Sequence, residues 1–229
     1  MQTWTGRLIR LHQYLAAHAV YASVLVSALA VALLLGRMVR SHSVIYSFLL
    51  WNLLLAWIPY WSSLWGDSLY ERYPRKPLRL LFPGLLWLAF FPNAPYMLTD
   101  LWHLRERPSI PLWYDASMLL VFALAGLYLA VFSLRTMERL VRAHGGALAG
   151  WLFVLLAVTL AGLGVYMGRF LRWNSWDLVL HPQEVLTDVM LRLTNPMEHP
   201  RALVFTVLSA AILLVSHLAL TSRDQHRPA

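Results

Sequence analysis

Six long stretches without a single charged side chain constrain this sequence more than any other feature. Residues 11–36, 41–66, 80–99, 116–134, 143–168 and 202–222 contain no Asp, Glu, Lys or Arg, and together they cover 138 of the 229 residues. A helix needs about 20 predominantly apolar residues to cross the hydrocarbon core of a bilayer. Charged residues make up 13% of the chain, against about 25% in soluble domains. The pattern predicts an integral membrane protein and excludes water-soluble enzymes, nucleic-acid binders and disordered chains.

We expect an all-α bundle of six transmembrane helices that forms a single membrane domain over residues 1–229. The predicted spans lie near residues 19–36, 44–62, 78–92, 112–134, 148–168 and 202–221. These segments are apolar on every side, as helices embedded in lipid or fully buried must be. Trp and Tyr crowd the span ends, which is typical of the aromatic belt at headgroup level. The sequence shows no internal repeat and no linker to a second domain.

The first span raises the alternative of a cleavable signal peptide. Arg7 and Arg10 would form its basic region, and Ala28-Leu29-Ala30 resembles a cleavage site. The apolar run continues to Gly36, however, which is longer than a signal peptide needs. We therefore interpret it as an uncut span.

The basic residues, which give the chain a formal charge of +8, lie in the short connections between apolar stretches. In that position they set topology and contact lipid phosphates, so membrane lipids rather than nucleic acid are the expected partners. Six spans put both termini on one side, where 11 of the 19 Lys and Arg residues fall, Arg223 and Arg227 among them. This bias predicts cytoplasmic termini in a bacterial plasma membrane. The absence of cysteine excludes disulfides and thiolate chemistry.

The predicted outer loop, residues 169–201, is far longer than a helix connection requires. Residues 182–193 within it predict a short amphipathic helix. Pro182 suits the first helical position, and Glu184 suits the positive end of the helix dipole. The apolar side chains of this segment share one face, so we expect the helix to lie in the outer membrane interface.

Two polar segments interrupt the apolar pattern, and the first is Phe90–His103. Pro92 and Pro95 break helical hydrogen bonding at the end of the third span and leave carbonyl groups free. Asn93 lies between them and can satisfy those groups or meet a ligand. Asp100 and His103 are three residues apart and would share a helix face. The alternative is that the prolines end the span, Asp100 caps a segment and His103 faces water.

The second polar segment is Gly168–Asp177, at the end of the fifth span. Arg169 and Arg172 are spaced to hold one phosphate or carboxylate together. Trp173 and Trp176 would flank such a headgroup. The alternative is that both arginines reach lipid phosphates or neutralise acidic residues structurally. Gly164 and Gly168 form a small-xxx-small pair, which favours close helix packing.

Topology brings the two segments together, because the third and fifth spans both run outward and the fourth begins on the same face. The predicted site has Asp100 and Asp177 as catalytic carboxylates, either of which would serve as a general base. Its predicted substrate-binding residues are Asn93, His103, Asp115, Arg169, Arg172, Trp173, Asn174, Trp176 and His181. No phosphate-binding loop or dinucleotide motif is present, and the acidic and histidine residues have no compact metal-ligand spacing. We therefore expect neither a cofactor nor a metal.

At Phe91–Leu101, Gly168–Asp177 and the Trp113-Tyr114-Asp115 start of the fourth span, the chain resembles a family of bacterial multi-pass membrane proteins. That family is catalogued as domain of unknown function 1361. The resemblance runs from the second span through the long loop. It implies a multi-pass fold, and it transfers no catalytic residue because the family has no established reaction.

These features predict an outer-face polar pocket that binds an anionic lipid or another phosphate-bearing envelope precursor. Whether the protein acts on that ligand as an enzyme stays open, as does the oligomeric state. Two other functions stay open. A transporter would use the Pro-broken third span as its gate, although Asn52 is the notable polar side chain inside the spans and none is ionised. A non-catalytic scaffold or partner subunit would leave the polar segments satisfying one another.

Overall fold

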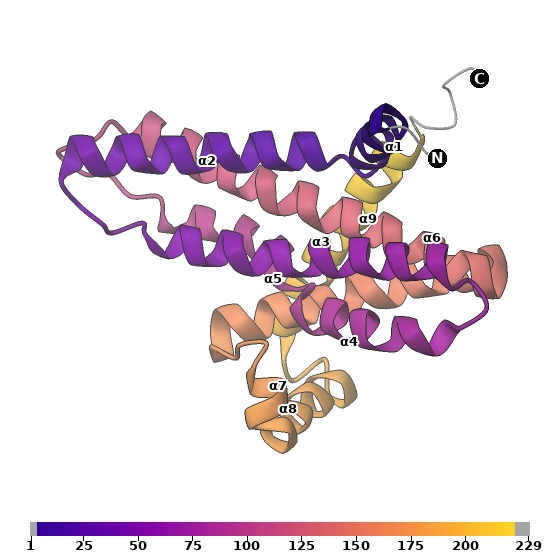
Figure 1. Ribbon diagram of the computed structural model, residues 1–229. Helices are drawn as coiled ribbons and strands as arrows, with labels where there is room; N and C mark the ends of the chain where they lie inside the picture. The colour runs from indigo at the N-terminus through magenta and orange to yellow at the C-terminus, as the bar shows by residue number, and fades with distance from the viewer. Residues whose placement is uncertain (1–3, 223–229) are drawn as a thin grey trace.

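The computed structural model describes residues 4–222, and within this range it contains helices and no β-strand, as the sequence predicts. Figure 1 shows the elements. In chain order they are α1 (Trp4–Ala17), α2 (Val20–Ser41), α3 (Phe48–Arg72), η1 (Pro77–Leu80), α4 (Leu81–Phe90), α5 (Asn93–Tyr96), η2 (Met97–His103), α6 (Leu112–Tyr166), η3 (Met167–Leu171), α7 (Asp177–Leu180), α8 (Pro182–Thr194) and α9 (Pro200–Ser222).

Helix α6 is two helices joined at a sharp bend. Gly146 has φ 79°, a left-handed conformation that is not helical and that glycine adopts without steric cost. A straight helix of 55 residues would be about 80 Å long, more than twice the thickness of a bilayer core. In Figure 1 the pink first arm, residues 112–145, runs to the bend, and the orange second arm, residues 147–166, returns beside it.

Four segments of the described chain are long and apolar enough to cross a membrane. They are Val20–Ser41, Pro77–His103, Leu112–Leu171 and Pro200–Thr221. The third contains two of the six predicted spans, because it includes both arms of α6. Helix α3 is not among the four, since Asn52, Pro59 and the Ser62-Ser63 pair dilute its apolar run. The four segments indicate a membrane-embedded protein, but they do not by themselves establish six crossings.

The outer surfaces of these helices are apolar. Within the 18-residue apolar stretch of each helix, only 11% of α9 and 28% of α2 is buried inside the protein. Leu25 on α2 and Val215 on α9 are 70% and 63% exposed. Exposed apolar surface on this scale is unfavourable in water, whereas lipid tails accept it.

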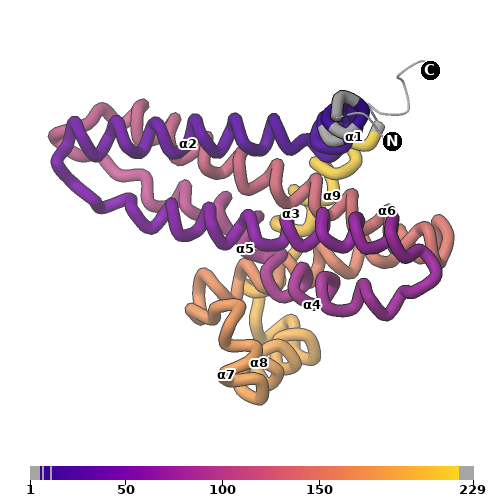
Figure 2. The backbone as a smooth tube through the Cα atoms, in the orientation of Figure 1, coloured from indigo at the N-terminus to yellow at the C-terminus, as the bar shows by residue number. Residues whose placement is uncertain are grey.

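The first arm of α6 lies at the centre of the core. Its buried side chains include Met118, Phe122 and Leu129, which are fully enclosed. Helix α6 packs against α9, α3, α2, α5 and η2, and the tube in Figure 2 shows the first arm running along α2 and α3. The core therefore forms around one long helix rather than between equivalent helices.

Two parts of the structure bear on the ends of the chain and the outer loop. Helix α1 was not predicted, because the sequence placed the first span from residue 19; Ala19, with φ 56°, separates α1 from α2. Helix α8 covers the predicted amphipathic segment, with Val185 buried and Leu186 56% exposed. Its place in a membrane interface stays a prediction. Arg223 and Arg227, on which the predicted position of the termini partly rests, lie outside the described residues.

A close backbone approach fixes α5 against α6. A Cβ atom at Gly126 would lie 2.4 Å from the carbonyl oxygen of Ala94 and 2.9 Å from the Cβ of Met97. Real Cβ atoms do not come this close to backbone, so the segments can meet here only because residue 126 is glycine.

We expect Gly126→Ala to lower the free energy of unfolding by about 1–3 kcal/mol, because the added methyl forces α5 away from α6. The measurement is the thermal midpoint of the purified protein in detergent. Gly84→Ala is the matched control, since its Cβ would meet nothing closer than the Cε of Met137 at 3.9 Å. Equal midpoints for the two variants would contradict the close approach.

Candidate functional site

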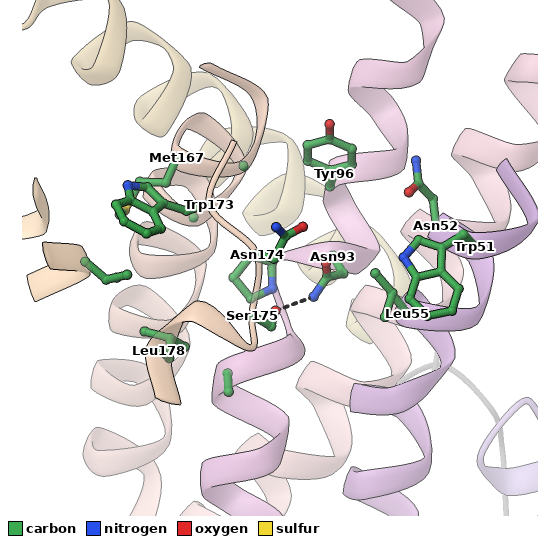
Figure 3. Close-up of a pocket in the computed structure, with 15 residues that line it drawn as sticks. Trp51, Asn52, Leu55, Asn93, Tyr96, Met167, Trp173, Asn174, Ser175 and Leu178 are labelled. Carbon is green, nitrogen blue, oxygen red and sulfur yellow. Dashed lines mark hydrogen bonds between the residues drawn. The ribbon is translucent and has the colours of Figure 1, made fainter. Parts of the chain in front are cut away.

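The two prolines of the first polar segment interrupt the helix, and Asn93 supplies a side-chain hydrogen bond to the backbone there. Pro92 lies between α4 and α5, and Pro95 lies within the short helix α5, which η2 follows. The Nδ2 of Asn93 donates to the carbonyl oxygen of Phe90 at 2.9 Å and to the Oγ of Ser175 at 2.8 Å (Figure 3). This contact matches the first of the two roles considered for Asn93, a hydrogen bond to the backbone near the prolines, and the same amide joins the two polar segments.

The second arm of α6 packs directly on this break. A Cβ at Gly164 would lie 2.6 Å from the Cγ of Pro92, and one at Gly168 would lie 3.3 Å from the ring of Tyr96. The predicted role of these glycines in close packing is confirmed. After the arm, the backbone widens into the π-helix η3, a geometry that is frequent at functional sites.

A cavity of about 170 Å³ lies between α3, the broken helix and the segment that follows η3. Figure 3 shows side chains from these three parts of the chain around it. Its polar lining consists of amides and hydroxyls without a formal charge, namely Asn52, Asn93, Tyr96, Asn174 and Ser175. The indoles of Trp51 and Trp173 and the apolar side chains Leu55, Met167, Leu178 and Val185 complete the wall.

Asp100 does not line this cavity, but it is hydrogen-bonded to Asn52, which does. Its side chain is 1% exposed, and its Oδ2 accepts a 2.9 Å hydrogen bond from the Nδ2 of Asn52, which lines the cavity. Its Oδ1 has no hydrogen-bond donor among residues 4–222. A buried carboxylate oxygen without a donor is costly in a protein interior.

Two basic groups flank that oxygen without bonding to it. The Nη1 of Arg169 lies 3.9 Å away and the Nδ1 of His103 lies 3.8 Å away. The guanidinium of Arg169 also lies over the ring of Trp102, 5.5 Å from its centroid. This matches the structural alternative for Arg169, in which it neutralises Asp100.

The other predicted carboxylate organises the backbone of the loop. The Oδ2 of Asp177 accepts from the backbone N–H of Asn174 at 2.7 Å and from its side-chain amide at 3.3 Å. This turn presents Asn174 and Ser175 to the cavity. No contact within the described residues joins Asp177 to Asp100.

The remaining residues of the second polar segment lie around the turn. Trp173 donates its indole N–H to the Oδ2 of Asp188 on α8 at 2.7 Å, which ties the loop to that helix. Trp176 meets Trp51 edge-on, with ring centroids 6.4 Å apart. Arg172 is exposed and has φ 62°. His181 is exposed and lies 3.7 Å from Glu184.

Asp115 lies in a different contact. The Nε of Arg37 is 2.7 Å from its Oδ1, the Nη2 is 3.2 Å from its Oδ2, and both side chains are 1% exposed. Such a bidentate pair ties α2 to the start of α6. Neither residue lines the cavity.

The structure thus places Asn93, Trp173 and Asn174 on the cavity, with Asp100, His103 and Arg169 clustered behind it. It does not bring the other five predicted site residues to the cavity wall, namely Asp115, Arg172, Trp176, Asp177 and His181. Sequence reasoning missed Trp51 and Tyr96 and gave Asn52 no role; an amide alone in a charge-free stretch is the signal that marks it. In the described part of the chain, no three His, Asp or Glu side chains are grouped to hold a metal.

The family model described as Protein of unknown function (DUF1361) matches residues 51–216. The match covers most of the chain, and the chain belongs to this family. No curated protein and no solved structure matches it.

We expect Arg169→Gln to destabilise the protein by about 1–3 kcal/mol, because Asp100 is left buried without a nearby permanent cation. The double variant Arg169→Gln/Asp100→Asn should regain most of that loss, since it removes both charges. Thermal midpoints in detergent measure both effects. A double variant less stable than Arg169→Gln would contradict a charge-compensating role for Arg169.

Proposed function

We propose that this DUF1361 protein binds the polar headgroup of a lipid, or of a lipid-linked envelope precursor, in the cavity between α3, the broken helix and the loop after η3. The observation that carries the proposal is the lining of this cavity by five amide and hydroxyl side chains beside two indoles. Small-molecule sites typically combine an apolar wall with a few polar groups that fix orientation.

The chemistry of the lining favours a headgroup with hydroxyl, amide or phosphate oxygens. The hydroxyl of Tyr96 can donate and accept, and Asn174 offers its side-chain oxygen, because its amide N–H groups already bond to Arg172 and Asp177. The indoles of Trp51 and Trp173 cover apolar faces. The anionic part of the ligand would contact Arg172, which is exposed and next in sequence to Trp173. Arg169 would act indirectly, because it already faces Asp100.

In this proposal Asp100 contributes to ligand binding, and no particular reaction is assigned to it. Its contact with the ligand would pass through Asn52, whose amide it orients. A polar side chain fixed from behind is better placed to recognise a ligand, because less freedom is lost on binding. The same carboxylate would be the general base if the protein acts on the ligand.

We further propose six membrane crossings, by α2, α3, residues 77–103, the two arms of α6 and α9. Helix α3 is long enough for this role, since 25 residues span about 37 Å. An even number of crossings puts α1 and the end of α9 on one side of the membrane. The excess of Lys and Arg on that side supports a cytoplasmic location for it in a bacterial cell.

We expect Ala89→Leu to reduce the lipid that co-purifies with the protein about threefold or more, because the larger side chain occupies part of the cavity that Ala89 lines. The measurement is mass spectrometry of lipids extracted from the detergent-purified protein. Ala28→Leu, at an exposed position of α2, is the matched control and should retain the wild-type amount. Unchanged lipid in Ala89→Leu would show that the cavity is not the binding site.

We expect a reporter fused after Ala229 to behave as a cytoplasmic domain. Green fluorescent protein at that point should fluoresce, and alkaline phosphatase should be inactive, because both report the compartment in which they fold. A phosphatase fusion truncated after Asn195 should be active, since that residue follows α8 on the proposed outer side. Phosphatase activity after Ala229 would contradict the six-crossing topology.

A further inference from the structure

A second group of buried polar residues lies far from the cavity described above. On α3, Asp67 is 15 residues beyond Asn52, which corresponds to about 22 Å along a helix. Asp67 pairs with His18, which lies between α1 and α2, and with Arg139, near the end of the first arm of α6. Thr221 of α9 lines a cavity with both basic residues, and Figure 1 shows the end of α9 beside α1.

Two buried acidic groups there hold two arginines. The Oδ1 of Asp67, 2% exposed, accepts from the Nη2 of Arg139 at 2.6 Å. The Oε1 of Glu138, 6% exposed, lies 3.3 Å from the Nη1 of Arg142. Each arginine uses few of its five N–H donors in these contacts. The acids therefore orient the guanidinium groups and leave most of the N–H donors available.

Two histidines complete the cluster. The Nε2 of His18 lies 3.0 Å from the Oδ2 of Asp67 and 3.0 Å from the Nη2 of Arg139. The Nε2 of His217 lies 3.0 Å from the Oε2 of Glu138. Both acids are therefore matched by basic partners on two sides, which fixes them inside the bundle.

The arginines open onto a cavity of about 260 Å³. Arg135, Arg139 and Arg142 follow one another at intervals of four and three residues, so they share one face of α6. All three line the cavity together with His18, Thr136, Thr221 and the acidic Glu138, whose charge is met by Arg142 and His217. The side chains of Arg139 and Arg142 are 56% and 44% exposed, which leaves their donors accessible.

We infer that this cavity is a second binding site, for a phosphate-bearing anion, held by Arg139 and Arg142 with Arg135. Guanidinium groups in a fixed orientation match phosphate oxygens with paired hydrogen bonds. The hydroxyls of Thr136 and Thr221 already donate to the carbonyl oxygens of Phe132 and His217 at 3.0 and 2.7 Å, so the guanidinium groups supply the donors for the anion. The volume is below the range of about 300–1,000 Å³ for pockets that hold drug-sized ligands, so it fits a phosphate group or a lipid headgroup. The inference does not depend on a ligand in the other cavity.

Free phosphate and the headgroup of an anionic lipid share this chemistry, and two measurements separate them. The first is calorimetric titration of the full-length protein, purified without phosphate, with inorganic phosphate and pyrophosphate. The second is the thermal midpoint of the protein in phosphatidylcholine vesicles with and without phosphatidylglycerol. Saturable binding in the first measurement identifies a soluble anion, and a lipid-dependent rise in the second identifies a headgroup.

Arg142→Gln is the decisive variant, because Glu138 keeps His217 as a partner when Arg142 is neutralised. We expect it to weaken the anion response about tenfold or more. Arg139→Lys keeps a charge beside Asp67 and loses the planar fork, so it should weaken the response several-fold and remain folded. Arg79→Gln removes a charge on η1 outside this cavity, where Arg79 lies over the ring of Tyr73, and should behave as wild type.

Three results would overturn the inference: no response to either probe, a response that survives Arg142→Gln, or an equal loss in Arg79→Gln. Ala89→Leu separates this site from the proposed headgroup cavity, because it should leave the response to phosphate unchanged. Loss of lipid in Ala89→Leu together with no dependence on Arg142 would support the first site and remove the second.

Discussion

Each buried carboxylate of this bundle has a basic partner, and most of the helix arrangement depends on these pairs. Charge in an apolar interior is stable only when it is matched and hydrogen-bonded. In residues 4–222 four acidic side chains are buried. Asp67 faces Arg139 and His18, and Asp100 faces Arg169. Asp115 faces Arg37, and Glu138 faces Arg142 and His217. Each of these four acids lies on α6 or has a partner on α6 or on η3, which continues it. The long helix is therefore held in register against α2, α3, η2 and α9.

The broken helix depends on a second constraint of the apolar environment, which is that backbone carbonyl groups need hydrogen-bond partners. Proline removes helical hydrogen bonds, and in a membrane the freed carbonyl groups need a partner inside the protein. Asn93 supplies one, and its second hydrogen bond brings Ser175 and the outer loop against the break. The cavity lies where these two polar segments meet, because neither segment continues there as a regular packed helix.

The bend at Gly146 lets one helix build both polar regions. The first arm carries the arginines of the second cavity near its end, and the second arm delivers Gly164, Gly168 and Arg169 to the broken helix. The two regions differ in character. One cavity is lined by neutral amides, hydroxyls and indoles, with a carboxylate and an arginine behind them, whereas the other presents arginines directly.

The membrane-embedded, all-helical class, the position of α8 and the family could all be predicted from the sequence, because charge-free runs, helical periodicity and local motifs are properties of consecutive residues. The sequence also indicated close packing at the Gly164/Gly168 pair, and it left Asn93 either bonding the backbone near the prolines or meeting a ligand. Only the tertiary structure decided which charges pair. Asp115 was expected beside the polar segments and instead meets Arg37, 78 residues earlier, and Asp67 meets His18 and Arg139. Such partners depend on how helices rotate and pack, and sequence spacing within one helix carries no information about that.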